Sequence, residues 1–76
     1  MELQDFLNFL NREFDFDTTG ICEDTTFEEI GFDELDMIDL VMSAEDEFLM
    51  EIPDEALEKI ETIGDFIDYI NKKSES

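Results

Sequence analysis

Apolar side chains recur along this chain at the spacing of an α-helix and nowhere alternate as they do in a half-buried strand. In the first segment they fall at i, i+3, i+4, i+7 and i+11, at Leu3, Phe6, Leu7, Leu10 and Phe14. Residues at this spacing share one face of a helix, and that face needs another apolar surface to cover it. The pattern therefore predicts an all-α fold with helices packed around one core.

A long loop and an acidic helix are expected next. The stretch from Asp15 to Thr26 is rich in Asp and Thr and contains Gly20, which predicts a loop. Asp33 is a good N-cap, so we place a second helix at about residues 34 to 49. The stripe predicted for this helix has Met37 on its flank and consists of Leu35, Ile38, Val41, Met42, Ala44, Glu45 and Phe48.

Two shorter segments complete the predicted bundle. Ile52-Pro53 interrupts the second helix, because the residue before a proline disfavours helical geometry. A short third helix is expected over residues 54–60. The sequence Thr62-x-x-Asp65 resembles a capping box that opens a fourth helix. Residues 1–73 are thus predicted to form one domain, followed by a flexible tail at 74–76.

The chain is strongly acidic. Its 76 residues include 24 Asp and Glu against 4 Lys and Arg, which gives a formal net charge of −20. Residues 13–58 contain no basic side chain. This charge excludes nucleic acid as a direct partner and disfavours anionic membranes, whereas a basic protein patch is its natural complement. We expect a monomer.

The single cysteine and the absence of any membrane-length apolar run set the expected location. Cys22 has no partner for an intramolecular disulfide and is expected to be half-buried. No signal-like segment is recognisable. A reducing, cytoplasmic setting is therefore the expectation.

The segment Gly31-Phe32-Asp33-Glu34-Leu35-Asp36 resembles the Gly-x-Asp-Ser-Leu motif of acyl carrier proteins, with Glu34 at the position of the serine. The resemblance covers about residues 3–71 and implies a four-helix bundle with a long first loop and a short third helix. It also implies a role in fatty-acid or polyketide synthesis. Its other motifs lie at 26–31, 36–42, 45–48, 51–54 and 62–70.

In that family the serine hydroxyl carries a 4'-phosphopantetheine arm. Glu34 has no hydroxyl, so the resemblance implies that this chain carries no covalent cofactor unless a serine is restored there. We interpret the chain as a non-carrying docking or regulatory protein. The alternative is a genuine acyl carrier whose attachment serine has been replaced in this sequence.

The resemblance also assigns partner binding to the acidic second helix. Its carboxylates would meet basic patches on enzymes of acyl-chain synthesis or transfer, with methionines as adaptable apolar contacts. The open alternative is a solvated face that keeps the protein soluble. The candidate partner-binding residues are Asp33, Glu34, Asp36, Met37, Asp39, Met42, Glu45 and Glu47.

The first loop contains a weak candidate for a cation site. Asp15, Asp17 and Glu23 partly follow the spacing of a calcium-binding loop, with Gly20 at its sixth position. The twelfth position is Thr26, where such a loop needs a bidentate Glu. A calcium-responsive acidic protein is therefore a third hypothesis.

The residue types needed for catalysis are missing from the sequence. The chain has no histidine, its cysteine has no adjacent base, and no Gly-rich phosphate loop occurs. Pairs of carboxylates carry little information in so acidic a chain. We therefore do not expect an enzyme.

Overall fold

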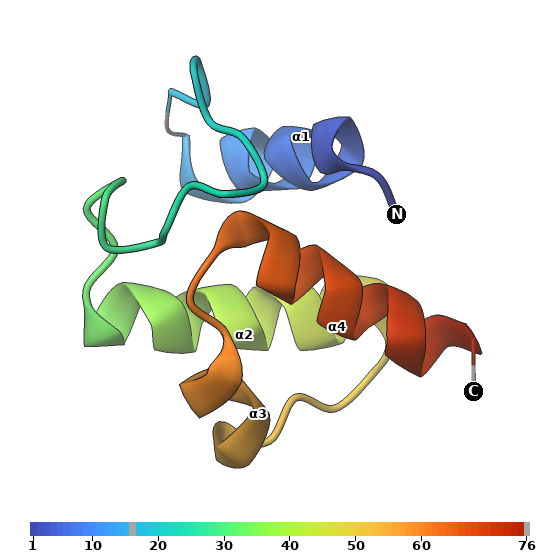
Figure 1. Cartoon of the computed structure of the whole chain (residues 1–76). Coiled ribbons are helices and arrows are strands. Elements are labelled where there is room, and N and C mark those ends of the chain that lie inside the picture. Colours follow the sequence, from blue (N-terminus) through green and yellow to red (C-terminus); the bar gives the residue numbers. More distant parts are fainter. Residues whose placement is uncertain (16, 76) are drawn as a thin grey trace.

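The described chain folds into four helices (Figure 1). A computed structural model describes residues 1–15 and 17–75. Within these residues β-structure is limited to one isolated bridge, between Thr26 and Thr62. The helices are α1 (Leu3–Phe14), α2 (Glu34–Phe48), α3 (Asp54–Lys59) and α4 (Ile63–Glu75).

The ends of the helices lie close to the predicted positions, with two differences. The helix α4 continues to Glu75, so the first two residues of the predicted tail at 74–76 are helical, and Ser76 lies outside the described residues. The helix α2 ends at Phe48, and its C-cap Leu49 adopts the left-handed conformation with φ 53°. The chain has therefore left the helix before it reaches Ile52-Pro53, because the left-handed residue already turns the backbone.

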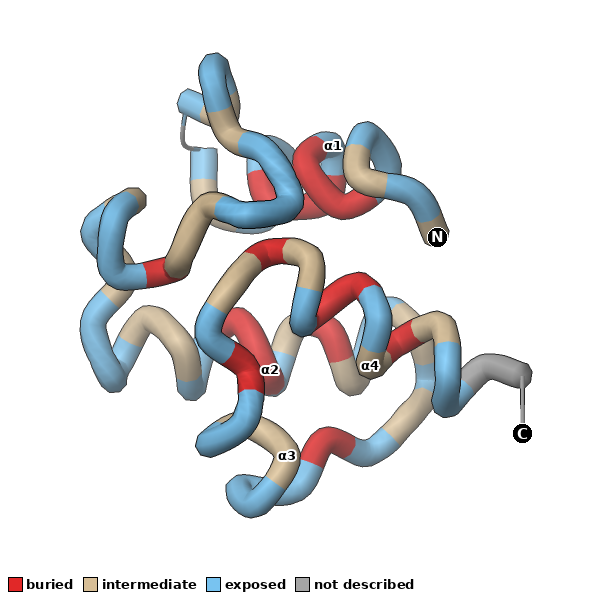
Figure 2. The backbone as a smooth tube through the Cα atoms, in the orientation of Figure 1, coloured by how far each residue is buried: buried red, intermediate tan, exposed pale blue. Residues whose placement is uncertain are grey.

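The core lies between α1, α2 and α4, as the buried stretches in Figure 2 show. Phe6 and Phe66 are fully buried, and their ring centroids lie 5.1 Å apart. Phe27, from the segment before α2, packs on Phe66 at 6.0 Å. Phe9 was not part of the predicted stripe of α1, yet it is 3% exposed and contacts the ring of Phe48 at 5.3 Å.

The predicted inward face of α2 is only partly correct, because Val41, Ala44 and Phe48 pack in the core but the other predicted apolar residues do not. Leu35 and Met42 are 71% and 62% exposed, and Ile38 is also exposed. The face that packs inward follows a second stripe with equally good helical spacing, because α2 is apolar on more than one side. This inward stripe consists of Met37, Leu40, Val41, Ala44 and Phe48.

The first loop is hydrogen-bonded to the beginning of α4. Ile63 N–H donates to the Thr25 carbonyl at 2.9 Å, and Gly64 N–H donates to the Glu23 carbonyl at 2.8 Å. A Cβ at position 64 would lie 3.0 Å from that same Glu23 oxygen, so glycine permits the close approach. These bonds fix the loop so that Phe27 reaches the core. Cys22, which we expected to be half-buried, is exposed on this loop.

Candidate functional site: the groove at the start of α2

Glu34 is the first residue of α2 and is exposed. The helix begins here because Asp33 and Asp36 form a reciprocal cap. Asp36 N–H donates to Asp33 Oδ1 at 2.9 Å, and Asp33 N–H donates to Asp36 Oδ2 at 3.1 Å. Among the described residues, no hydrogen bond or ion pair engages the Glu34 side chain. Its carboxylate suits this place because the N-terminal end of a helix favours negative charge.

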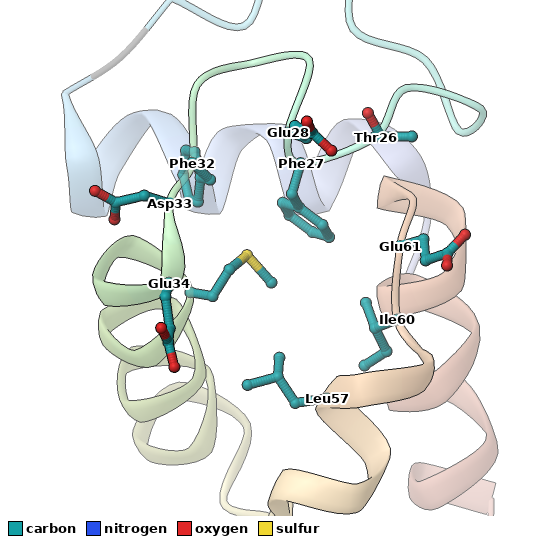
Figure 3. A pocket seen from close by; sticks show the side chains of 10 residues that line it. Thr26, Phe27, Glu28, Phe32, Asp33, Glu34, Leu57, Ile60 and Glu61 are labelled. Atoms are coloured by element: carbon teal, nitrogen blue, oxygen red, sulfur yellow. The ribbon is translucent and has the colours of Figure 1, made fainter.

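Glu34 lies at the edge of a groove of about 600 Å³ between α2, α3 and the segment before α2 (Figure 3). The floor is apolar and includes the side chains of Phe27, Leu57 and Ile60, which converge in the close-up view. The residues that line the groove are Thr26, Phe27, Glu28, Phe32, Asp33, Glu34, Met37, Leu57, Ile60 and Glu61.

All the charged residues that line the groove are acidic. Four exposed acidic residues line it, and no basic residue does; the acidic residues are Glu28, Asp33, Glu34 and Glu61. Lys59, a neighbour of Ile60 in sequence, lines a separate pocket between α3 and α4. The groove thus combines an apolar interior with a negatively charged edge.

Four of the eight predicted partner-binding residues make contacts within the chain. Asp33 and Asp36 cap α2. Glu45 Oε2 accepts the Ile52 N–H at 2.8 Å, and Glu47 Oε1 pairs with Arg12 Nη2 of α1 at 3.0 Å. The N-cap role of Asp33 was predicted from the sequence, whereas the contacts of Glu45 and Glu47 join residues further apart and were not.

The other predicted residues differ in exposure. Glu34, Asp39 and Met42 are exposed, whereas Met37 is half-buried, packs against the core and lines the groove. Sequence reasoning missed Leu35 and Ile38, which it placed in the core and which the structure exposes on α2. The second apolar stripe of the helix was the available signal for them.

The structure does not gather the weak metal candidates of the first loop into a site. Asp17 Oδ1 accepts the Thr19 N–H at 2.9 Å, and hydrogen bonds from the Thr19 side chain and backbone lower the pKa of Asp17. Within residues 1–15 and 17–75, no group of three or more His, Cys, Asp or Glu side chains is arranged to hold a metal ion. Asp15, Asp17 and Glu23 therefore do not form a three-ligand cluster.

Comparison with known proteins identifies the family. Residues 4–70 match the family model described as a phosphopantetheine attachment site. The fold is similar to the crystal structure of an acyl carrier protein from Thermotoga maritima, with 41% sequence identity and a TM-score of 0.86. That match covers 96% of this chain and 86% of the other chain.

The chain therefore belongs to the acyl carrier protein family. The predicted four-helix fold of that family is confirmed. Members of the family are carriers rather than enzymes, which agrees with the expectation that this chain is not an enzyme. In the described part of the chain, no helix has the length and apolar character needed to cross a membrane.

Proposed function

We propose that this chain acts without a covalent phosphopantetheine arm, as a docking or regulatory member of its family. The observation that supports the proposal is Glu34, an exposed carboxylate on the first turn of α2 at the place where the family motif has serine. A carboxylate attacking the arm's phosphate would give a mixed acyl phosphate, which water hydrolyses readily. Glu34 is therefore expected to stay unmodified.

No hydroxyl nearby on α2 takes over the role. Ser43 follows Glu34 by nine residues, which is about 13 Å along a helix with a rise of 1.5 Å per residue. It is also half-buried, unlike Glu34. The Thr26 hydroxyl in the groove accepts the Glu29 N–H at 3.1 Å and lies outside α2.

Intact-mass spectrometry tests the loss of carrying. The native chain and a Glu34→Ser variant are incubated with coenzyme A and a promiscuous phosphopantetheinyl transferase. We expect the native mass to stay unchanged and the variant to gain one arm, since only the variant offers a hydroxyl in the motif. A stable arm on the native chain would refute the proposal.

The surface proposed for docking is the exposed side of α2. Leu35, Ile38 and Met42 present apolar area, and the exposed carboxylates of Glu34 and Asp39 lie on the same helix. Apolar contacts bordered by negative charge complement a basic patch with an apolar centre. We propose such patches on enzymes of acyl-chain synthesis or transfer, in the cytoplasm, with this chain bound as a monomer.

Charge reversal at Asp39 tests the docking surface. Asp39 is exposed and, unlike Asp36, takes no part in the helix cap, so Asp39→Lys should leave α2 intact. Binding to purified acyl transferase and ketosynthase is measured by interferometry, with Asp24→Lys in the first loop as the control of equal charge. We expect Asp39→Lys to weaken binding about tenfold or more and Asp24→Lys to leave it nearly unchanged. Equal effects of the two variants would show that net charge alone drives binding.

The alternative is a genuine acyl carrier in which the serine has been replaced. The match to the attachment-site family across residues 4–70 favours it. The loaded Glu34→Ser variant separates the two readings through its activity with the same transferase and ketosynthase. Acyl transfer at a carrier's usual rate supports the alternative, whereas a loaded arm that these enzymes do not use supports the non-carrying role.

A further inference from the structure

Glu34 cannot hold the arm as serine does, yet its side chain matches the group that links such an arm to serine. We propose that the Glu34 carboxylate mimics this phosphodiester, so that the chain competes with arm-bearing carriers for the enzymes that act on the arm. The inference rests on the proposed function, because it needs an unmodified Glu34 and docking through α2. It adds the class of partner and the means of regulation.

A glutamate and a serine phosphodiester place their negative charge alike. In the phosphodiester the phosphorus follows Cβ and Oγ, and in glutamate Cδ follows Cβ and Cγ, so both charged centres lie equally many bonds from Cα. Each group shares a single negative charge between two terminal oxygens. An arginine guanidinium can therefore pair with either group through two parallel hydrogen bonds. An aspartate in this place would be one bond too short.

The structure presents the Glu34 carboxylate to a partner. Glu34 is exposed on the first turn of α2, and none of the other groups that the structure describes bonds to its side chain. The reciprocal cap of Asp33 and Asp36, with bonds of 2.9 and 3.1 Å, fixes the backbone that carries it. Figure 3 shows the carboxylates of Asp33 and Glu34 pointing in different directions. A partner can thus pair with Glu34 without breaking the cap.

The cation that pairs with Glu34 has to come from the partner. None of the described residues that line the groove beside it is basic, and residues 13–58 contain no Lys or Arg. An enzyme that receives the arm meets its phosphodiester at the first turn of α2, where a cationic side chain would also pair with Glu34. The transferase that installs the arm meets a neutral serine there, and its coenzyme A phosphates repel a carboxylate.

Variants at this one position test the mimicry. The native chain, Glu34→Gln, Glu34→Asp and Glu34→Ser with and without an arm are checked for folding by circular dichroism, and their binding to purified ketosynthase is measured by interferometry. We expect Glu34→Gln and bare Glu34→Ser to bind about fivefold or more weakly than the native chain, with Glu34→Asp in between. The arm-bearing variant should bind at least as tightly as the native chain. Asp24→Asn, which removes an exposed charge of the first loop, is the control and should change binding little.

Kinetics and a second enzyme separate mimicry from docking alone. The native chain should raise the KM of the ketosynthase for the arm-bearing, acylated Glu34→Ser variant without lowering kcat, because the two compete for one site. The phosphopantetheinyl transferase should show the reverse order of affinity, with bare Glu34→Ser bound at least as tightly as the native chain.

Several results would overturn the proposal. They are Glu34→Gln or Glu34→Asp binding the ketosynthase as tightly as the native chain, an equal loss for Asp24→Asn and Glu34→Gln, or a transferase that prefers the native chain. A ketosynthase that binds the arm-bearing variant but not the native chain would also overturn the mimicry, while the loss of carrying would still stand. A stable arm on the native chain, seen by intact mass, would instead refute the proposed function itself.

Discussion

Two reciprocal caps decide where the helices after the first loop begin. Asp33 and Asp36 bond to each other's backbone at the start of α2, and Thr62 and Asp65 do the same at the start of α4. The sequence predicted Asp33 as the N-cap of α2 and the capping box of Thr62 and Asp65, because capping residues bond to backbone groups within three positions and need no tertiary partner. The return bond to Asp36 was not predicted. Helix caps of this kind can therefore be predicted from the sequence alone.

The Asp65 cap gives a pH-dependent prediction. Backbone hydrogen bonds from Glu61 and then Thr62 lower the pKa of Asp65. Because the folded pKa lies below the unfolded value of about 3.9, the stabilisation is present above that value and is lost as the pH falls through the folded pKa. Asp65→Ala should therefore cost about 0.5–1 kcal/mol at neutral pH, with the gap to the native chain closing below about pH 4.

Urea unfolding across this pH range measures that gap. Asp68→Ala is the control, since Asp68 is exposed on the same helix and pairs with Lys72 at 3.6 Å on the surface. Its effect should be smaller, because exposed ion pairs contribute little. A gap for Asp65→Ala that is constant with pH would mean that the ionised carboxylate is not what stabilises the cap.

At the scale of the element, α2 carries two apolar stripes and only one of them can face the core. Leu40 is fully buried, whereas Met42 is 62% exposed, although periodicity alone fits either side. The phase of the helix is decided by the core that it shares with α1 and α4, in which Phe9 of α1 contacts Phe48. The exposed stripe is what makes this helix a candidate docking surface.

Truncating a buried and an exposed apolar residue of α2 should change the free energy of unfolding by very different amounts. Leu40→Ala is expected to cost about 2–5 kcal/mol, because it leaves a cavity in the core. Met42→Ala should change the free energy of unfolding by no more than about 0.5 kcal/mol, since its side chain is largely in solvent. Urea unfolding of both variants measures the difference. A larger loss for Met42→Ala than for Leu40→Ala would place Met42, and not Leu40, in the core.

At the scale of the molecule, negative charge opposes the compact state. The chain has a formal net charge of −20 within extents of 32 × 24 × 21 Å. The Debye length is about 30 Å at 0.01 M salt and about 8 Å at 0.15 M, so only the lower concentration lets charges repel across the whole molecule. Arg12 of α1 reduces this repulsion locally, because its Nη2 lies 3.0 Å from Oε1 of Glu47 in α2.

Added salt should therefore stabilise the fold. We expect the thermal unfolding midpoint to rise between 0.01 and 0.15 M sodium chloride, since screening removes more repulsion than it removes attraction from the few ion pairs. Circular dichroism follows the transition. A variant with two exposed charges neutralised, Asp24→Asn with Glu58→Gln, should show a smaller rise. A midpoint that falls with salt would mean that attractive pairs outweigh the repulsion.

The sequence by itself determined the helices, their caps, the family resemblance and the place of Glu34 on the first turn of α2. These follow from spacing and capping, which act within a few residues along the chain. Only the tertiary structure decided which side of α2 is buried, which of its carboxylates hold the fold, and that Phe27, Leu57 and Ile60 meet beside Glu34. Those features depend on contacts between segments far apart in sequence, and local periodicity carries no information about such contacts.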